Sequence, residues 1–243
     1  MQITIAESKL VVRKDASFHV PVYCTNEGQS KSIEEELVIV YNLYLELMKR
    51  RRVVITGVGA VTPLGIGAEE SWRALCQGKS GASRITRFDA SAFETQIAAE
   101  VQNFHAEDFL ETKRIRRTDL FTQYAMAAAR MAIADSRIVI GENNAHRIGV
   151  ILGSCVGGIG TLCHNIATLL EGKLEDISPF LASMFIPSAG ANEITIALGI
   201  KGPSRGVSTA CATGSHAIGD AFRFIQHGET DVMIAGGAEA GIV

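Results

Sequence analysis

Residues 207–221 read VSTACATGSHAIGDA and place one cysteine, Cys211, where an apolar strand gives way to a helix of small residues. The N-terminus of a helix offers free backbone N–H groups and the positive end of the helix dipole. This setting favours the thiolate form of a cysteine. A thiolate can accept an acyl group, and adjacent N–H groups can stabilise the oxyanion of the transfer. Cys211 is therefore the candidate catalytic nucleophile.

Strand and helix patterns alternate on either side of this stretch. Apolar runs rich in β-branched residues predict buried strands over 53–58, 147–153, 203–210 and 231–235. Helical spacing and capping signals predict helices over 69–77, from Thr118 or Asp119 to about 134, over 160–170 and 189–198, and from Cys211 to about 227. This order predicts an α/β fold, with helices on both faces of a sheet.

Several motifs together carry a family resemblance. Besides residues 207–221, they are RRVVITGVGAVTPLG at 51–65, DLFTQYA at 119–125, ISPF at 177–180 and DVMIAGGAE at 231–239. In order and spacing they resemble the first half of the β-ketoacyl-acyl carrier protein synthases, of the type II elongation kind found in bacterial fatty-acid synthesis. The resemblance implies that residues 48–243 form the N-terminal half of a thiolase-like αβαβα fold, a mixed sheet covered by helices.

Residues 1–47 match nothing in that family and form an N-terminal extension of unknown role. Val11–Val12 and 20–23 suggest weak strands, and Ser32 with Glu35 resembles a capping box that would start a helix over 34–47. The extension is either an appended segment without a catalytic role or a docking segment. The sequence leaves both interpretations open.

The resemblance also implies substrate-contacting residues. Val156 stands at the gating position of a small-residue loop, 153–160, that would line an acyl-chain pocket. Phe180 opens the segment 180–187, which in the family closes the same pocket from the partner subunit. The following residues, 188–192, read SAGAN where the family commonly has Asn-Met-Ala-Ala-Gly, and this departure bears on chain-length preference and on the dimer contact.

A compact basic cluster precedes the helix expected after Thr118. It reads KRIRR over 113–117, and by resemblance Lys113, Arg116 and Arg117 would dock an acidic acyl carrier protein. A solvated charged face is the competing interpretation. Nucleic acid is disfavoured because the patch is isolated and the formal net charge of the chain is −3.

The resemblance implies a complete reaction. Cys211 would take an acyl chain from its carrier protein and condense it with malonyl-carrier protein, releasing carbon dioxide without a metal or other cofactor. Members are cytoplasmic homodimers, and residues 203–210 would meet the partner across the two-fold axis. They also use two histidines and a lysine from their C-terminal half, so the 243-residue chain is expected to accept an acyl group slowly at most and not to condense it. His216, five residues into the helix, lies about 140° from the face of Cys211 and is not expected to replace them.

Two alternatives stay open. The chain could be a related polyketide or aryl-polyene ketosynthase, or a non-catalytic truncated partner subunit, against which the presence of Cys211 argues. A nucleotide loop over 57–65 is disfavoured, since its spacing is not G-x-G-x-x-G and Pro63 fits a phosphate-binding helix start poorly.

Composition excludes further classes of protein. No apolar run reaches the roughly 18–20 residues of a membrane span, and no signal peptide opens the chain. The five cysteines, at 24, 76, 155, 163 and 211, lack paired or zinc-binding spacing. This favours reduced thiols in a cytoplasm, with no metal, and predicts that the four cysteines other than Cys211 are packing or surface residues.

Overall fold

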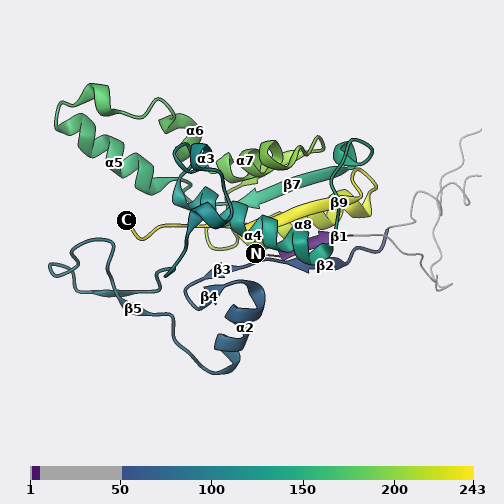
Figure 1. The fold of residues 1–243 in the computed structure, drawn as a ribbon, viewed down its shortest axis with the longest axis horizontal. Coiled ribbons are helices and arrows are strands. Elements are labelled where there is room, and N and C mark those ends of the chain that lie inside the picture. The colour runs from purple at the N-terminus through teal and green to yellow at the C-terminus, as the bar shows by residue number, and fades with distance from the viewer. Residues whose placement is uncertain (1, 6–50) are drawn as a thin grey trace, which may run out of the picture.

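The computed structural model describes residues 2–5 and 51–243. A five-stranded mixed sheet with strand order β2-β1-β9-β7-β8 forms its centre (Figure 1). These strands are β1 (Gln2–Ile5), β2 (Ile55–Val58), β7 (Ile148–Gly153), β8 (Ser204–Val207) and β9 (Val232–Gly237). β7, β8 and β9 run parallel, whereas β1 is antiparallel to both β2 and β9.

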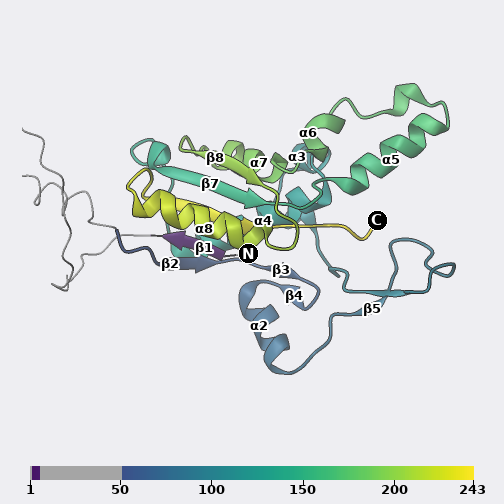
Figure 2. The ribbon, with the colours of Figure 1, turned by 180° about the vertical axis from the view of Figure 1, so that it is seen from behind.

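Helices cover both faces of this sheet. On one face lie α4 (Leu120–Ser136) and α7 (Ala189–Leu198), and on the other lies α8 (Thr213–Gln226), which Figure 2 shows across the sheet. Alternate strand residues serve the two sides: Val150 and Leu152 pack with the first pair of helices, whereas Ile151 packs with α8. The α/β fold predicted from the sequence is confirmed.

The remaining elements extend from this centre. They are the two-stranded ladders β3–β4 (Val61–Thr62, Gly65–Ile66) and β5–β6 (Ser83–Arg84, Ile97–Ala98), the helices α2 (Ala68–Cys76), α3 (Thr112–Ile115), α5 (Ile159–Leu170) and α6 (Leu181–Phe185), and the single 3₁₀ turns Ala106–Asp108, Ala145–Arg147 and Leu174–Asp176. None of the helices in the described part of the chain combines the length and apolarity that a membrane crossing requires.

Element boundaries follow the sequence closely where local signals set them. Asp119 caps α4, because its carboxylate accepts a hydrogen bond from the Phe121 N–H. Gly228, with φ 77°, follows α8 as its expected stop. Residues 57–65 include the end of β2 and most of the β3–β4 ladder, which the sequence did not predict. β1 was not expected either, and the strands and helix suggested for 11–47 lie outside the described residues.

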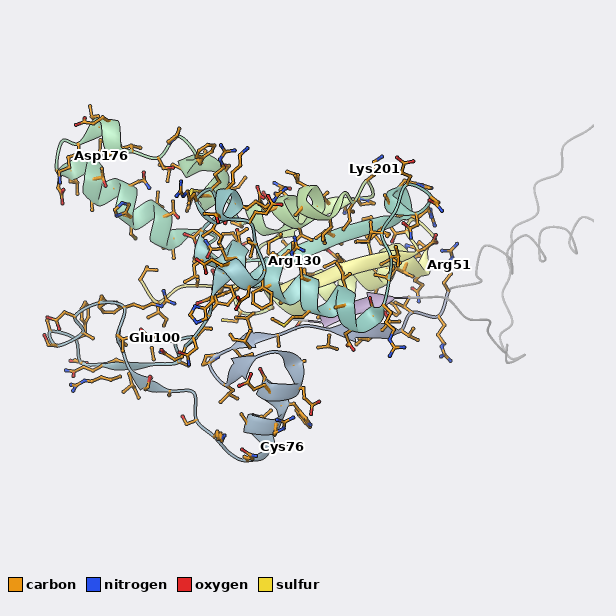
Figure 3. The ribbon with its side chains drawn as sticks, in the orientation of Figure 1. Arg51, Cys76, Glu100, Arg130, Asp176 and Lys201 are labelled. Atoms are coloured by element: carbon orange, nitrogen blue, oxygen red, sulfur yellow. The ribbon has the colours of Figure 1, made fainter. Side chains whose placement is uncertain are left out.

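Asp231 anchors the start of β9, at the end of the sheet where Figure 3 labels Arg51. Arg147 holds its carboxylate through two bonds of 2.7 and 3.0 Å, and Arg51 adds a third of 2.7 Å. These bonds, chiefly those from Arg147, lower the pKa of Asp231 from 3.8 to about 2. The arginines therefore join the segments before β2, β7 and β9.

Replacing Asp231 by asparagine should flatten the acid dependence of stability. The pKa of Asp231 is lower in the folded state than in the unfolded state. Its ionised carboxylate therefore contributes its full stabilisation above about pH 5, and this stabilisation is lost as pH falls toward 2. The side chain is 51% exposed, so solvent screening limits the loss at pH 7 to about 1 kcal/mol. Urea unfolding across this pH range measures it, with Asp220→Asn, an exposed carboxyl on α8, as control. Parallel pH curves for the Asp231→Asn variant and the wild type would contradict the expectation.

Candidate functional site

Cys211 lies in a tight turn between the end of β8 and the start of α8, and its side chain is exposed. Ala210, just before it, has φ 51°, a left-handed conformation that residues with a Cβ rarely adopt. The N–H groups of Ala212 and Thr213 donate to the carbonyls of Thr209 and Ala210, at 3.2 and 3.1 Å. The strand-to-helix setting predicted for Cys211 is thus what the structure has.

The hydroxyl of Thr213 holds this turn closed. It accepts the Thr209 N–H at 2.8 Å and donates to the Ala210 carbonyl at 2.5 Å, while the residue itself is buried. Two backbone groups just before Cys211 are satisfied by one side chain. Because such groups are costly to leave unpaired, Thr213 fixes the path of the chain through the cysteine.

The backbone N–H of Cys211 itself is left available in the turn. The N–H groups of Ala212 and Thr213 are used inside the turn, whereas no acceptor is found for the Cys211 N–H among residues 2–5 and 51–243. An uncommitted N–H adjacent to a nucleophile is the kind of donor that stabilises a developing oxyanion. The turn therefore supplies a thiol and one such donor together.

Glycines at the strand ends determine where the turn sits. A Cβ on Gly153, the last residue of β7, would lie 2.1 Å from Cγ2 of Thr213, and one on Gly237, at the end of β9, would lie 3.0 Å from Cα of Gly214. The first turn of α8 packs directly on these two strand ends. Cys211 is thereby placed at the carboxyl edge of the parallel strands, where α/β sheets commonly bind ligands.

Glu239 links the strand ends, and the sequence did not predict it as a site residue. Its carboxylate accepts the Cys155 N–H at 2.6 Å and the Ser154 hydroxyl at 3.2 Å. The Ser208 hydroxyl in turn donates to the Cys155 carbonyl at 3.0 Å. The segments after β7, β8 and β9 are thus linked beside Cys211. The available signal was an acidic residue just past a buried strand.

His216 lies near the nucleophile without engaging it. Its Nδ1 is 2.6 Å from the Thr209 hydroxyl oxygen, two residues before Cys211. The described residues include no hydrogen bond between His216 and the Cys211 thiol. The imidazole contacts the turn and not the thiol, in agreement with the prediction that His216 does not act as the base.

The loop carrying Val156 and the segment opened by Phe180 lie against each other. The Gly158 N–H donates to the Phe185 carbonyl at 3.0 Å, so the loop before α5 packs on α6. Val156 is 41% exposed, and Phe180 is half-buried. The structure brings the two expected pocket residues into neighbouring segments.

Asp119 ties this region to the core. Besides capping α4, its carboxylate accepts the N–H and the hydroxyl of Thr161, at 3.0 and 2.6 Å. Thr161 lies in the first turn of α5, so one buried carboxylate orders the starts of two helices. This second role of Asp119 was not anticipated from the sequence.

The basic cluster divides into two parts. Arg114 pairs with Glu193 of α7 at 2.9 Å, and the Arg117 guanidinium lies 4.6 Å from the centre of the Phe180 ring. Lys113 and Arg116 are exposed, and no ion pair is described for either within residues 51–243. Arg117 thus connects the expected docking patch to the expected pocket segment.

Among the described residues, the three other cysteines do not lie in a tight strand-to-helix turn of this kind. Cys76, Cys155 and Cys163 are exposed, and Cys24 lies outside the described residues. Cys76 ends α2, away from the sheet (Figure 3). In the part of the chain that is described, no three potential metal ligands gather.

Comparison with known sequences places this geometry in context. Residues 50–242 match the family described as "Beta-ketoacyl synthase, N-terminal domain". The 3-oxoacyl-[acyl-carrier-protein] synthase 2 of Coxiella burnetii is 48% identical over 192 residues, covering 79% of this chain and 46% of the relative. The corresponding Staphylococcus aureus (strain COL) protein is 42% identical over 196 residues, covering 81% and 47%. The chain spans about half the length of these relatives.

Solved structures show the same partial match. "The ishigamide ketosynthase/chain length factor" superimposes with a TM-score of 0.72 at 34% identity, over 79% of this chain and 48% of that one. A β-ketoacyl synthase from Burkholderia phymatum STM815 gives a TM-score of 0.64 at 30% identity, over 74% and 45%. The fold expected from the resemblance is therefore confirmed over about half of those chains.

Proposed function

The chain belongs to the β-ketoacyl synthase N-terminal domain family, and from that premise we propose that Cys211 accepts the acyl group in carrier-protein-dependent fatty-acid elongation. The observation that carries the proposal is the exposed thiol in a turn fixed by Thr213, beside the uncommitted Cys211 N–H. The substrates would be an acyl-carrier protein and malonyl-carrier protein.

The first step is a thioester exchange. The Cys211 thiolate attacks the carbonyl carbon of the acyl thioester, and the Cys211 N–H donates to the resulting oxyanion. Collapse breaks the bond to the carrier sulfur, which leaves as a thiolate and takes up a proton. The acyl group is then joined to Cys211.

Condensation would follow with malonyl-carrier protein. Loss of carbon dioxide from the malonyl thioester leaves a carbanion, which forms a carbon–carbon bond to the acyl carbonyl and expels the Cys211 thiolate. The resemblance assigns activation of this step to two histidines that the family carries in its C-terminal half. We propose that the 243 residues support the acyl transfer and not the condensation.

Loss of the thiol should abolish acylation. After incubation with acyl-carrier protein, or with an epoxide that alkylates thiols, the wild type should gain one acyl or one epoxide mass, and Cys211→Ala should gain neither. Intact-protein mass spectrometry measures this, with Cys155→Ala as the matched control because Cys155 is also an exposed thiol. Labelling that disappears in Cys155→Ala but persists in Cys211→Ala would overturn the assignment.

The same experiment separates the rival functions. A folded chain that gains no mass would favour a non-catalytic partner subunit. Faster acylation by a polyketide-type carrier protein than by a fatty-acid one would favour a polyketide or aryl-polyene ketosynthase. One of the solved structures that this chain resembles is described as a ketosynthase/chain length factor, and this supports testing both alternatives.

We place carrier-protein docking at Lys113, Arg116 and Arg117. Reversing all three to glutamate should slow association with an acidic carrier protein by about tenfold or more at low salt, with the difference shrinking as salt rises. Stopped-flow binding measures the rate. Arg130→Glu and Lys201→Glu, which reverse exposed charges elsewhere (Figure 3), are the controls. An unchanged rate in the triple variant would remove the docking assignment.

The remaining parts of the proposal concern substrate and assembly. Val156 and Phe180 would contact the acyl chain, since their segments adjoin beside the strand ends.

β8 lies at the edge of the sheet, and Ser204–Gly206 are exposed, so this edge is available to the β8 of a second copy in a homodimer. A reducing cytoplasmic setting suits a chain that works through a free thiol.

A further inference from the structure

Two exposed cysteines lie just beyond the ends of β7 and β8. Cys155 follows the last residue of β7 by two positions, and Cys211 follows the last residue of β8 by four. The two strands are parallel neighbours, side by side in Figure 2, so both cysteines are brought to the same edge of the sheet. The proposed acyl transfer uses Cys211 and gives Cys155 no role.

Hydrogen bonds hold Cys155 beside the chain that leaves β8. The Ser154 N–H donates to the Val207 carbonyl at 3.1 Å, which continues the parallel pairing of β7 and β8 by one residue. The Ser208 hydroxyl donates to the Cys155 carbonyl at 3.0 Å. Because adjacent strands lie roughly 4.7–4.9 Å apart, Cys155 is a close neighbour of Ser208 and of the residue after it.

The turn that follows keeps Cys211 near this segment. The Ala212 N–H donates to the Thr209 carbonyl at 3.2 Å, and Thr209 and Cys211 form an isolated bridge. A four-residue turn closed in this way holds its first and last Cα atoms within about 7 Å of each other. Cys211 is therefore folded back toward the residues that Cys155 borders.

The side of β7 that faces α8 is the side on which position 155 continues. Ile151 packs with α8, and a Cβ on Gly153 would lie 2.1 Å from Cγ2 of Thr213, in the first turn of that helix. Residues two apart along a strand face the same side, so Cys155 extends this row. Cys211 lies at the start of α8, on that same side.

The backbone of Cys155 is held, whereas its thiol is available. Glu239 accepts the Cys155 N–H at 2.6 Å, and Ser208 holds the carbonyl. Within residues 2–5 and 51–243, no hydrogen bond involves the Cys155 sulfur. A disulfide requires Cα atoms about 4.4–6.8 Å apart, a spacing of the kind that adjacent strands and tight turns produce.

We propose that Cys155 is the resolving thiol of a peroxide-sensitive pair with Cys211. The Cys211 thiolate attacks one oxygen of hydrogen peroxide, the O–O bond breaks, and Cys211 becomes a sulfenic acid while hydroxide leaves. The Cys155 thiol then attacks the Cys211 sulfur, the S–O bond breaks, and a disulfide forms with release of water. The two thiols lose two electrons together, and the peroxide is reduced to water and hydroxide.

The disulfide keeps the nucleophile recoverable. A sulfenic acid that meets no second thiol proceeds to a sulfinic acid, which thiol reductants do not reverse. A disulfide is returned to two thiols by a dithiol reductant. Formation of the pair is independent of acyl transfer, and only the resulting block of acylation rests on the proposed function.

Peroxide treatment of the reduced full chain tests the pair. The wild type should lose the mass of two hydrogen atoms, and a non-reducing digest should contain the Cys155 peptide joined to the Cys211 peptide. Cys155→Ala should instead gain the mass of two oxygen atoms at Cys211, and after dithiothreitol it should recover about tenfold less Cys211 alkylation than the wild type. The matched control, Cys163→Ala, removes an exposed thiol on α5 and should behave as the wild type.

A trivalent arsenical measures the approach of the two thiols without oxidation. Phenylarsine oxide joins two neighbouring thiols through its arsenic atom with loss of one water. The reduced wild type and Cys163→Ala should each retain one equivalent, whereas Cys155→Ala and Cys211→Ala should retain none. Because Cys155 is exposed and its described hydrogen bonds are made by its backbone, Cys155→Ala should remain folded.

The outcomes separate this inference from the proposed acyl transfer. Equal formation of sulfinic acid at Cys211 in the wild type and in Cys155→Ala would overturn the pair. A disulfide from Cys155 to another cysteine, or to a second copy of the chain, would do the same. A wild type that forms the Cys155–Cys211 disulfide, but accepts no acyl group when reduced, would support the pair and refute the acyl transfer.

Discussion

Replacing Gly153 by alanine is expected to move the N-terminus of α8 and to suppress acylation of Cys211. The added Cβ would meet Cγ2 of Thr213 at 2.1 Å and the backbone carbonyl group of Thr213 at 2.9 Å. Backbone atoms cannot rotate away, and Gly153 is buried at the end of β7. Overpacking of this kind costs about 1–3 kcal/mol. The first turn of α8 must shift, and it carries the hydroxyl that holds the turn at Cys211.

The Gly153→Ala variant should lose both stability and reactivity of Cys211, measured separately. Urea unfolding should show a loss of about 1–3 kcal/mol, and alkylation of Cys211 should slow by about tenfold or more under conditions where the variant is folded. The matched control is Gly219→Ala in the same helix, where a Cβ meets nothing within 4 Å. It should raise stability by up to about 1 kcal/mol and leave alkylation unchanged. A Gly153→Ala variant with wild-type alkylation would show that α8 does not position the thiol.

Replacing Gly59 by alanine is expected to have the largest effect on folding. Its Cβ would lie 1.9 Å from the Ala128 carbonyl oxygen and 3.0 Å from the Ala132 backbone nitrogen, both in α4. Gly59 is buried in the turn after β2, so neither the turn nor the helix can yield alone. The loss should exceed about 3 kcal/mol, because α4 must separate from the turn and the core.

Chemical denaturation and soluble yield measure this effect. Gly141→Ala is the control, since its nearest contact would be Oδ1 of Asn143 at 3.9 Å. It should stay within about 0.5 kcal/mol of the wild type. A Gly59→Ala protein that unfolds at the wild-type urea concentration would mean that α4 and the turn do not approach as closely as the structure has them.

The packing of Gly57 and Gly59 explains the glycines of the motif at 51–65 without a nucleotide. Gly57 and Gly59 both face α4, where a Cβ would meet the carbonyl oxygens of Ala132 and Ala128 at 2.1 and 1.9 Å. The glycines serve helix–strand packing. Their spacing could be read from the sequence, but the helix that requires them lies about 70 residues further along the chain.

The sequence by itself determined the features that local chemistry controls. Apolar β-branched runs gave β7 and β9, the cap at Asp119 gave the start of α4, and the turn between strand and small-residue helix gave the setting of Cys211. Each depends on residues within a few positions of one another, where periodicity and capping rules apply.

Only the tertiary structure decided what joins distant segments. β1 enters the sheet between strands some fifty and some two hundred and thirty residues away, Glu239 links the ends of β7 and β9, and Arg117 lies over Phe180. A few backbone pairings or one carboxylate leave no periodic pattern in the sequence. The packed fold fixes which groups lie within reach of one another, and backbone groups inside the sheet must find a partner there because burial makes unpaired ones costly.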